Sequence, residues 1–564
     1  MKINNSISRF ISNNTIWILI IVYVLVRSYY WDCFPVWDGM IHYTVLIDAI
    51  ISNFDILNYC NDNHICQGFM LFMALPYEFY KENYYAFNIW LTLVAVSGIV
   101  AFYYLLLFFF KSRLKNIEIV LITSLFVFHP SVLSAMTLFT IDTGVLIFFI
   151  FYWLMLLKGK RWAAGIFAFL LLFSKETSML LVPLPFMFCL LWQPSSAKRT
   201  LLKEFGKYFY TKTKETAEVL VPIPVLLRSL IKLSSERIQW LKRNFLIVLI
   251  PYFFLGLFML YKVFIRHQPA IWNKLSKDAV TLDYFGSDGR FVTYLGMIFL
   301  LNFNYILTVL WLVLLVVMIV KRNSINDLFQ KKLTLLFTLL FISGLVVLTL
   351  VVSWAQPRYV MLLIPFMLLA IAQLSSVLIS SKYVRIAGGI LLLILFAVED
   401  VRTVDPISKA FFGTFDFGEH KLLNLISRTH EENTAPGNYT TTQLTYNLEY
   451  LKISPLLNSI YSDIRPTAQT TFVYEPWTEW LLMNHLDSNY KMAYRGSDLV
   501  MPRIVTVDDI VRSQNLNPDV YYIELPNIDN RDLIERLNRF YPFKVSKTYD
   551  IDGYQANVIH YQKK

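Results

Sequence analysis

Charge is scarce in this chain of 564 residues: 16% of them are charged, whereas 56% are hydrophobic and the mean hydropathy is +0.49. These values lie outside the range of soluble globular domains. The 19 glycines form no Gly-rich phosphate loop, so nucleotide binding has no local support, and no nucleic-acid-binding motif is present. The first apolar stretch also lacks the small-residue cleavage site of a signal peptide. The sequence therefore predicts a polytopic α-helical membrane protein whose first span remains as an anchor.

Apolar runs recur from Ile16 to Val398. A spanning helix needs roughly 20 apolar residues. Three runs meet this length most clearly: 84–110, 245–265 and 292–320. We expect about eleven transmembrane helices in a domain of residues 1–398. Within it, residues 162–192 are expected to hold two short helices that meet at Ser174-Lys175-Glu176-Thr177.

Basic residues cluster in alternate loops, as they do on the cytoplasmic side of membrane proteins. The clusters contain Lys2, Arg9, Lys111, Arg113, Lys115, Lys158, Lys160, Arg161, Lys321, Arg322, Lys331, Lys332, Lys382 and Arg385. A longer basic loop, 193–244, is assigned to the same side. This pattern predicts a multi-pass protein of the plasma membrane with a cytoplasmic N-terminus. The net charge of +11 then reflects topology and attraction to anionic membrane lipids, and requires no nucleic acid.

Residues 399–564 are more polar and are predicted to form a separate extracytoplasmic domain. Short β-rich runs alternate with helical stretches there. The predicted strands are 470–474, 520–525, 543–549 and 555–561, and the predicted helices are 477–485, 507–513 and 531–541. Such alternation is typical of a small mixed α/β domain. This domain is a candidate to gate the membrane site or to bind the acceptor.

Polar residues gather at the outer ends of the predicted spans. The first outer loop, 31–83, carries Asp38 in Trp37-Asp38-Gly39, and also His64. The remaining candidates open or follow later spans: Asp142, Lys175, Glu176, Arg358 and Tyr359. Charges at membrane depth are costly and are functional candidates by default. We therefore expect these side chains to share one outward-facing cavity.

The order of these features resembles the GT-C glycosyltransferases, in particular the branch of protein O-mannosyltransferases and lipid A aminoarabinose transferases. The resemblance covers roughly residues 16–398. It rests on Asp38 in Trp37-Asp38-Gly39-Met40-Ile41-His42-Tyr43, Asp142 in Thr140-Ile141-Asp142-Thr143, Ser174-Lys175-Glu176-Thr177, and Gln356-Pro357-Arg358-Tyr359 with Pro365. The first outer loop departs from the family, because Asp38-Gly39 replaces a Pro-Asp-Glu or paired acidic motif, and Asn63-His64-Ile65-Cys66-Gln67 stands where relatives often show His-Pro-Pro.

The resemblance implies a hexosyl- or pentosyltransferase that moves a sugar from a polyprenyl-phosphate carrier to a lipid, glycan or protein acceptor at the outer membrane face. An acceptor hydroxyl needs a base within hydrogen-bond reach, and Asp38 is assigned this role. Lys175 and Arg358 are assigned to the departing phosphate. A single direct displacement would invert the anomeric configuration. The residues expected to bind the sugar or acceptor, or to orient these groups, are Asp142, Glu176, His64 and Tyr359.

Each candidate also has a structural interpretation. Asp38 suits the N-cap of an interfacial helix in the first outer loop, and Asp142 suits the N-cap of the fourth span. Lys175 and Arg358 can extend toward lipid headgroups. His64 can be an ordinary polar residue of a loop.

No His, Asp or Glu spacing demands a metal, and assistance by a divalent cation is left open. Cys33, Cys60 and Cys66 fall on the predicted outer side, where a disulfide can form, but their pairing cannot be deduced from the sequence. Two other functions remain as alternatives. One is a transporter or flippase for a lipid-linked sugar, although no internal repeat is visible. The other is a non-enzymatic envelope assembly protein, for which Asp38 would be dispensable.

Overall fold

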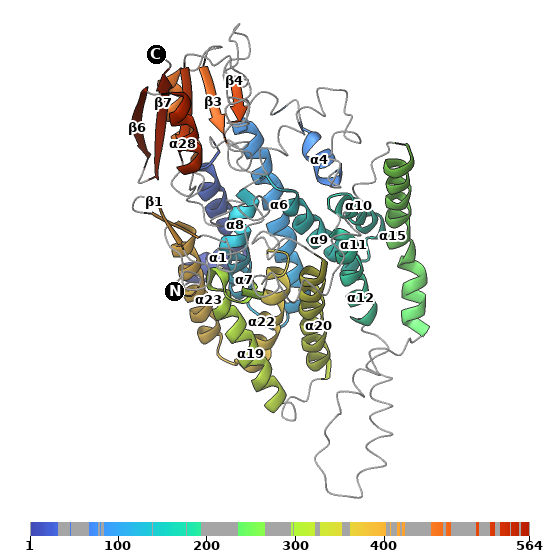
Figure 1. The fold of residues 1–564 in the computed structure, drawn as a ribbon. Helices are drawn as coiled ribbons and strands as arrows, with labels where there is room; N and C mark the ends of the chain where they lie inside the picture. Colours follow the sequence, from blue (N-terminus) through green and yellow to red (C-terminus); the bar gives the residue numbers. More distant parts are fainter. Residues whose placement is uncertain are drawn as a thin grey trace, which may run out of the picture.

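The computed structural model is mostly helical (Figure 1). It describes residues 2–31, 46, 67–76, 79, 84–137, 139–175, 177–192, 235–265, 295–296, 298–321, 328–351, 361–401, 407, 414–417, 420–423, 453–465, 470–474, 503–506, 519–524, 531–541, 543–551 and 554–562. The bundle helices are α1 (Lys2–Ser28), α4 (Gln67–Ala74), α6 (Tyr84–Phe110), α7 (Asn116–Val127), α8 (Pro130–Thr137), α9 (Ile141–Leu157), α10 (Arg161–Leu172), α11 (Ser178–Leu181), α12 (Pro183–Trp192), α15 (Ser235–Leu260), α19 (Asn304–Val320), α20 (Leu328–Val351), α22 (Ile364–Leu378) and α23 (Lys382–Val401). A π-helical turn, η1 (Tyr261–Ile265), extends α15, and a 3-10 turn, η2 (Leu301–Phe303), precedes α19.

Two helices among the described residues are long and apolar enough to cross a membrane, namely Tyr85–Phe110 and Arg237–Ile265. A third span results if α7 and α8, which are bent by 63° at their junction, are counted together. Shorter apolar helices surround them, among them α9, α10, α19 and α22. The predicted helical membrane architecture is therefore present in coarse form, and about eleven spans remains a prediction.

Neighbouring helices run antiparallel through short turns, which gives the bundle two distinct ends. Residues 111–115 join α6 to α7, and residues 158–160 join α9 to α10. The ammonium of Lys158 lies 4.8 Å from the ring centroid of Tyr104 on α6, so the two turns lie at the same end. We call this the basic end, because Arg113, Lys158, Arg161, Arg237, Lys332 and Arg385 lie there. The opposite end carries α4 (Figure 1).

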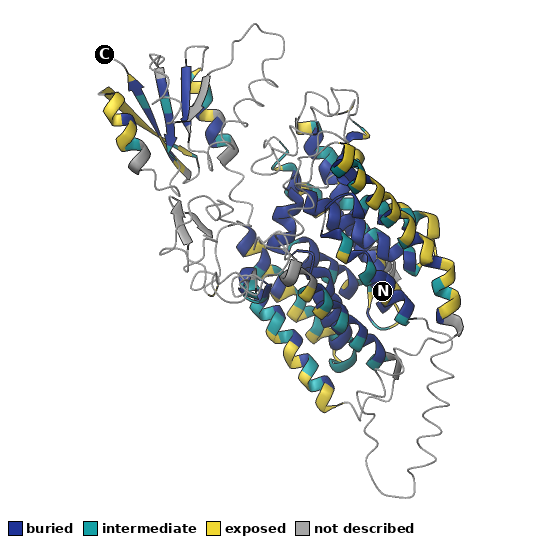
Figure 2. Ribbon diagram, turned by 45° about the vertical axis from the view of Figure 1, so that its right-hand side comes forward, coloured by how far each residue is buried: buried dark blue, intermediate teal, exposed yellow. Residues whose placement is uncertain are grey.

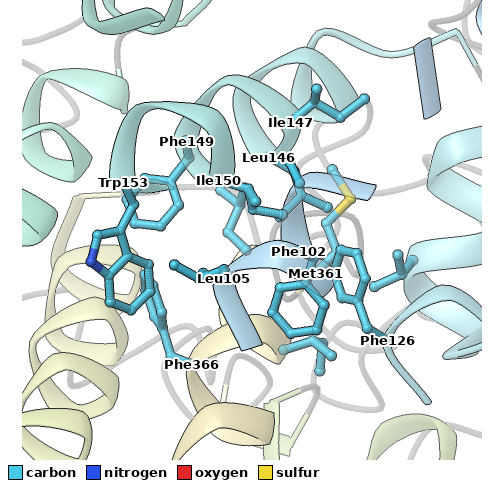
Figure 3. Packing of buried hydrophobic residues seen from close by; sticks show 14 of the residues in the cluster. Phe102, Leu105, Phe126, Leu146, Ile147, Phe149, Ile150, Trp153, Met361 and Phe366 are labelled. Carbon is cyan, nitrogen blue, oxygen red and sulfur yellow. The ribbon is translucent and has the colours of Figure 1, made fainter. Parts of the chain in front are cut away.

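Helix α9 lies at the centre of the bundle. Nearly every one of its residues is buried, and its sequence is apolar around the whole circumference, as expected of a helix enclosed by others. Aromatic side chains pack around it. The Phe149 ring centroid lies 5.2 Å from that of Phe366 (Figure 3), and the Trp153 centroid lies 5.1 Å from that of Phe188. Helices α15 and α19 instead expose apolar faces on the outside of the bundle, which Figure 2 shows in yellow.

Two helices of the bundle are interrupted, and in both cases the sequence explains why. Pro130 cannot continue α7, because proline lacks the amide hydrogen and disfavours a helical residue before it. The chain therefore breaks at His129 and restarts as α8. The second break follows α10, where Phe173 to Thr177 separate α10 from α11. This confirms the predicted meeting of two short helical segments at Ser174 and Lys175.

Residues beyond the bundle include a mixed five-stranded sheet in the order β4-β3-β5-β7-β6, with strands β3 (Thr470–Tyr474), β4 (Arg503–Thr506), β5 (Asp519–Glu524), β6 (Phe543–Ile551) and β7 (Tyr554–Gln562). Strand β3 pairs in parallel with β4 and β5, whereas β7 pairs antiparallel with β5 and β6. A separate hairpin joins β1 (Thr414–Phe417) to β2 (His420–Leu423). Strands β3, β5, β6 and β7 confirm the four predicted strands, whereas β1, β2 and β4 were not predicted.

Helix α28 (Arg531–Phe540) buries Leu537 against Val520 and Tyr522, on one face of the sheet. Helix α25 (Ile453–Ile464) packs on the other face, where the rings of Tyr461 and Phe472 lie 5.9 Å apart. The sheet lies beyond the end of the bundle that carries α4 (Figures 1 and 2). The predicted helices 477–485 and 507–513 lie outside the described residues.

Candidate functional site

A buried ion pair lies at the break between α10 and α11. The Nζ atom of Lys175 donates a hydrogen bond to Oδ1 of Asp142 over 2.6 Å, and the two side chains are only 10% and 3% exposed. The 12 residues of α10 give it a length of about 18 Å from the basic end. A hydrocarbon core is about 30 Å thick. The break at Lys175 therefore lies more than half the thickness of a hydrocarbon core from the basic end of the bundle.

Local structure places each partner of this pair. Asp142 is in the first turn of α9, where the positive end of the helix dipole favours a carboxylate. Thr140, and not Asp142, is the N-cap residue of α9, so the predicted capping role of Asp142 is wrong. Lys175 follows Ser174, whose hydroxyl donates to the Leu170 carbonyl over 2.6 Å and competes with continuation of α10.

Helix α4 joins the end of the first outer loop to this pair. The Gly68 amide donates to the Phe173 carbonyl over 2.7 Å, and a Cβ on Gly68 would collide with the Leu170 carbonyl and lie 3.0 Å from the Ser174 hydroxyl oxygen. The ring of Phe69 packs against Gly144 of α9, two residues beyond Asp142. The absence of side chains at both glycines lets α4 fit between α9 and α10, next to the ion pair.

Two hydroxyls follow Lys175 along the chain. The Thr177 Oγ1 and Ser178 Oγ atoms are buried, and within the described residues neither has a hydrogen-bond partner. Tyr252 of α15 holds this segment by donating its hydroxyl hydrogen to the Met179 carbonyl. A hydroxyl is both a donor and an acceptor, so this segment can bind the oxygens of a phosphate or a sugar.

A second buried polar group lies at the break between α7 and α8. His129 Nε2 lies 2.7 Å from Asn304 Oδ1, and the His129 ring centroid lies 5.0 Å from that of Phe396 on α23. One helical turn farther along α23, the carboxylate of Asp400 is buried, and among the described residues it has no hydrogen-bond partner. The Thr143 hydroxyl donates to the Ala135 carbonyl over 2.7 Å, which ties α8 to the start of α9.

Of the residues singled out from the sequence, the structure brings together Asp142 and Lys175. The others, Asp38, His64, Glu176, Arg358 and Tyr359, lie outside the described residues, as do Cys33, Cys60 and Cys66. Cys189 is buried in α12. The Asp142 carboxylate contacts the ammonium of Lys175, and its predicted roles in orienting Lys175 or binding sugar hydroxyls stay predictions.

Sequence reasoning missed several polar residues at this end of the bundle. They are Arg27, Gln67, Lys262, Asn304 and Asp400, each at most 6% exposed. A signal was present in each case, because a polar residue in the first or last turn of an apolar run is expected to be costly unless it has a role. Gln67 in particular was read only as part of a departure from the family motif.

The described residues contain no group of three or more His, Cys, Asp and Glu side chains that could hold a metal ion. A buried ammonium balanced by a carboxylate is a preorganised donor for an anion, and such donors act strongly where water is excluded.

No protein-family model and no curated protein matches the chain. Two solved structures are similar to it over its whole length. One is ArnT from Cupriavidus metallidurans bound to undecaprenyl phosphate, with 12% identity and a TM-score of 0.47, covering 96% of this chain and 97% of that one. The other is the same protein in the apo state, with 12% identity and a TM-score of 0.49, covering 97% and 98% of the two chains.

Proposed function

We propose that this protein is an integral membrane glycosyltransferase. It moves a sugar from a polyprenyl-phosphate-linked donor to a lipid, glycan or protein acceptor at the outer membrane face. Asp38 removes the proton of the acceptor hydroxyl, Lys175 and Arg358 bind the donor phosphate, and the anomeric configuration inverts. The proposal combines the resemblance found in the sequence with the observed contact between Asp142 and Lys175.

The observation that carries the proposal is the buried Lys175–Asp142 pair. An ammonium at membrane depth is expensive, and this one occupies a helix break beside the two hydroxyls of Thr177 and Ser178. Broken helices at membrane depth are tolerated where they are enclosed by protein or line a cavity. The arrangement is therefore better explained by an anionic ligand than by the packing needs of the bundle.

The positive charge of Lys175 suits it to stabilise the departing phosphate. As the bond between the anomeric carbon and the phosphate oxygen breaks, negative charge accumulates on the phosphate, and the ammonium of Lys175 stabilises it. An ammonium carries three donors, so Lys175 can bind Asp142 and a phosphate oxygen together. The Asp142 carboxylate balances the positive charge of Lys175 and limits its rotamers. The acceptor oxygen forms the new bond to the anomeric carbon, and its proton passes to Asp38.

Sugar transfer by the purified protein in lipid tests this proposal, with a panel of radiolabelled polyprenyl-phosphate sugars and membrane extract as acceptor. We compare the wild type with Asp38→Asn, Lys175→Met and the control Lys160→Met, which removes an exposed charge at the basic end. We expect Asp38→Asn and Lys175→Met to lose at least a hundredfold in turnover, about 3 kcal/mol of barrier, and Lys160→Met to retain it. Full turnover in Asp38→Asn would move the base elsewhere.

The break between α7 and α8 favours a second candidate, a transporter or flippase for a lipid-linked sugar, because broken helices are typical of transporter binding sites. Proteoliposomes that hold a fluorescent polyprenyl-phosphate sugar separate the two functions. Movement of the intact donor between leaflets without cleavage would support the transporter. Cleavage of the donor with no such movement would support the transferase.

A further inference from the structure

An imidazole nitrogen and a carboxylate are buried without partners at the outer end of the bundle, away from the Lys175 site. Nδ1 of His129 and both carboxylate oxygens of Asp400 have no hydrogen-bond partner among the described residues. His129 is fully buried, and Asp400 is 3% exposed. A buried polar atom without a partner is costly, and a charged one is more so. The functions considered so far use neither group.

Helix α23 brings Asp400 to the break between α7 and α8. The two helices α7 and α23 run side by side, because a Cβ on Gly389 would collide with the Leu121 side chain. Farther along, the Phe396 ring centroid lies 5.0 Å from that of His129. The chain bends by 63° there into α8, so only the last turn of α23 continues past His129. This last turn carries Asp400, and it is the part of α23 that can reach α8 and η2, both of which pack against α23.

The contact between His129 and α19 defines what is missing. His129 Nε2 lies 2.7 Å from Oδ1 of Asn304, at the start of α19. An amide oxygen only accepts, so Nε2 carries the imidazole hydrogen and Nδ1 offers a lone pair. An ionised carboxylate such as that of Asp400 also only accepts. Both groups therefore require hydrogen-bond donors, which none of the described residues supplies.

The spacing of these acceptors indicates hydroxyl groups as the donors. Asp400 is four residues, or about 6 Å of helix, beyond Phe396, which contacts His129. The donors must be spread over a comparable length. Hydroxyls on neighbouring carbons of a sugar ring are spread in this way, whereas the three donors of an ammonium share one nitrogen. The described residues also contain no group of three His, Cys, Asp or Glu side chains for a metal ion.

Helix α8 lies between this place and the buried ion pair. His129 precedes α8, and the Ala135 carbonyl within α8 accepts the hydroxyl hydrogen of Thr143, the residue after the carboxylate of the pair, over 2.7 Å. The six positions from His129 to Ala135 correspond to about 9 Å of helix. This length exceeds the width of one sugar ring. A sugar at Asp400 is therefore not the sugar whose phosphate lies at Lys175.

We propose that Asp400 and His129 form a hydroxyl-binding subsite for a sugar ring of the acceptor. Two neighbouring hydroxyls donate to the Asp400 carboxylate, and a third donates to His129 Nδ1. The inference rests on the proposed glycosyltransferase function, and it narrows the acceptor to a molecule that carries a glycan.

The test measures binding of methyl glycosides to the full-length protein in detergent by saturation-transfer NMR, without any donor. The panel contains methyl glycosides with neighbouring free hydroxyls and their deoxy analogues, which lack one of them. We expect a glycoside of the first kind to bind the wild type and the control Lys160→Met equally. Its affinity should fall by about tenfold or more in Asp400→Asn, and so should the affinity of its deoxy analogue for the wild type. Equal affinities of the wild type and Asp400→Asn, or no binding of any glycoside, would overturn the subsite.

Thermal stability separates ligand binding from a structural role. Without ligand, Asp400→Leu should melt higher than the wild type, because it removes a buried carboxylate that has no partner. Glu118→Leu is the matched control: Glu118 is 4% exposed and both of its carboxylate oxygens have partners, so this variant should melt lower. A melting temperature of Asp400→Leu as low as that of Glu118→Leu would show that Asp400 supports the fold and would overturn the subsite.

The same protein distinguishes this inference from the proposed function. Sugar transfer in a protein that binds no glycoside would overturn the subsite and leave the transferase in place. Glycoside binding that depends on Asp400, in a protein that transfers no sugar from any donor, would support the subsite and contradict the transferase.

Discussion

The ring of Phe69 occupies the space that a side chain at position 144 would fill. Gly144 lies on α9 half a turn from Asp142, and Phe69 lies on α4, the helix that ends the first outer loop. The contact therefore ties the loop predicted to carry the base to the helix that carries the carboxylate of the ion pair. Phe69 is fully buried, and its ring centroid lies 5.7 Å from that of Phe139 and 6.0 Å from that of Phe148.

Gly144→Ala should destabilise the protein by displacing Phe69. Overpacking a well-packed interior typically costs about 1–3 kcal/mol, and we expect a lower melting temperature together with a loss of sugar transfer. Gly165→Ala is the matched control, because a Cβ on Gly165 of α10 would meet nothing within 4 Å. Alanine in a helix is more favourable than glycine by roughly 0.5–1 kcal/mol, so the control should melt slightly higher. Equal melting temperatures of the two variants would show that α4 does not dock as described.

The sequence shows where helices of the bundle are interrupted more readily than which side chains meet at the interruptions. Pro130 and the polar run Ser174-Lys175-Glu176-Thr177 interrupt apolar stretches, and each marks a break that the structure contains. Strands β3, β5, β6 and β7 were likewise visible as β-rich runs. Strand β4 was missed because four residues, Arg503 to Thr506, are too few to show a period of two.

Contacts between distant segments were beyond sequence reasoning. Asp142 and Lys175 are 33 positions apart, and their pairing depends on how α9 packs against α10. The fit of Gly68 and Gly144 around α4 depends on helix–helix distance, which periodicity does not specify. Arg237 and Lys332 were counted as topology signals, since the sequence does not tell a buried cation from an exposed one.

Glu118 should be essential for the stability of the basic end. One of its carboxylate oxygens lies 2.7 Å from Nε of Arg385, and the other accepts the Lys115 amide hydrogen over 2.8 Å at the start of α7. Glu118→Gln keeps the cap but breaks the ion pair, which is nearly buried, at a cost of roughly 3 kcal/mol. Glu118→Ala should cost about 1 kcal/mol more through the lost cap. Melting curves of Glu118→Gln, of Arg385→Gln and of the double variant measure the coupling energy between these two side chains. Losses of stability that simply add in the double variant would contradict the ion pair.

The sheet beyond the bundle contains a pH-dependent contact. Lys547 donates to Asp463 over 2.6 Å and Tyr549 also donates to it, and these hydrogen bonds lower the pKa of Asp463. Because the pKa is lower in the folded state, the stabilisation is present above the unfolded value of about 4 and is lost as pH falls through the folded value. Hydrogen exchange of β6 amides should be faster in Asp463→Asn than in the wild type at neutral pH. The difference should vanish in acid; a difference that persists there would exclude the carboxylate as its cause.

Asp142 and Lys175 allow a structural role to be separated from a chemical one. Asp142→Asn removes the carboxylate that contacts the buried ammonium, and Lys175→Met removes the ammonium that contacts the buried carboxylate, so each should cost about 3–5 kcal/mol. Asp142→Leu combined with Lys175→Met replaces the pair by apolar groups and should restore most of the melting temperature. If Lys175 binds the donor phosphate, this stable double variant still transfers no sugar and binds the donor weakly. If instead the pair only holds α9 to α10, the double variant recovers turnover along with stability, and the phosphate ligand must be sought among the other cations at this end of the bundle.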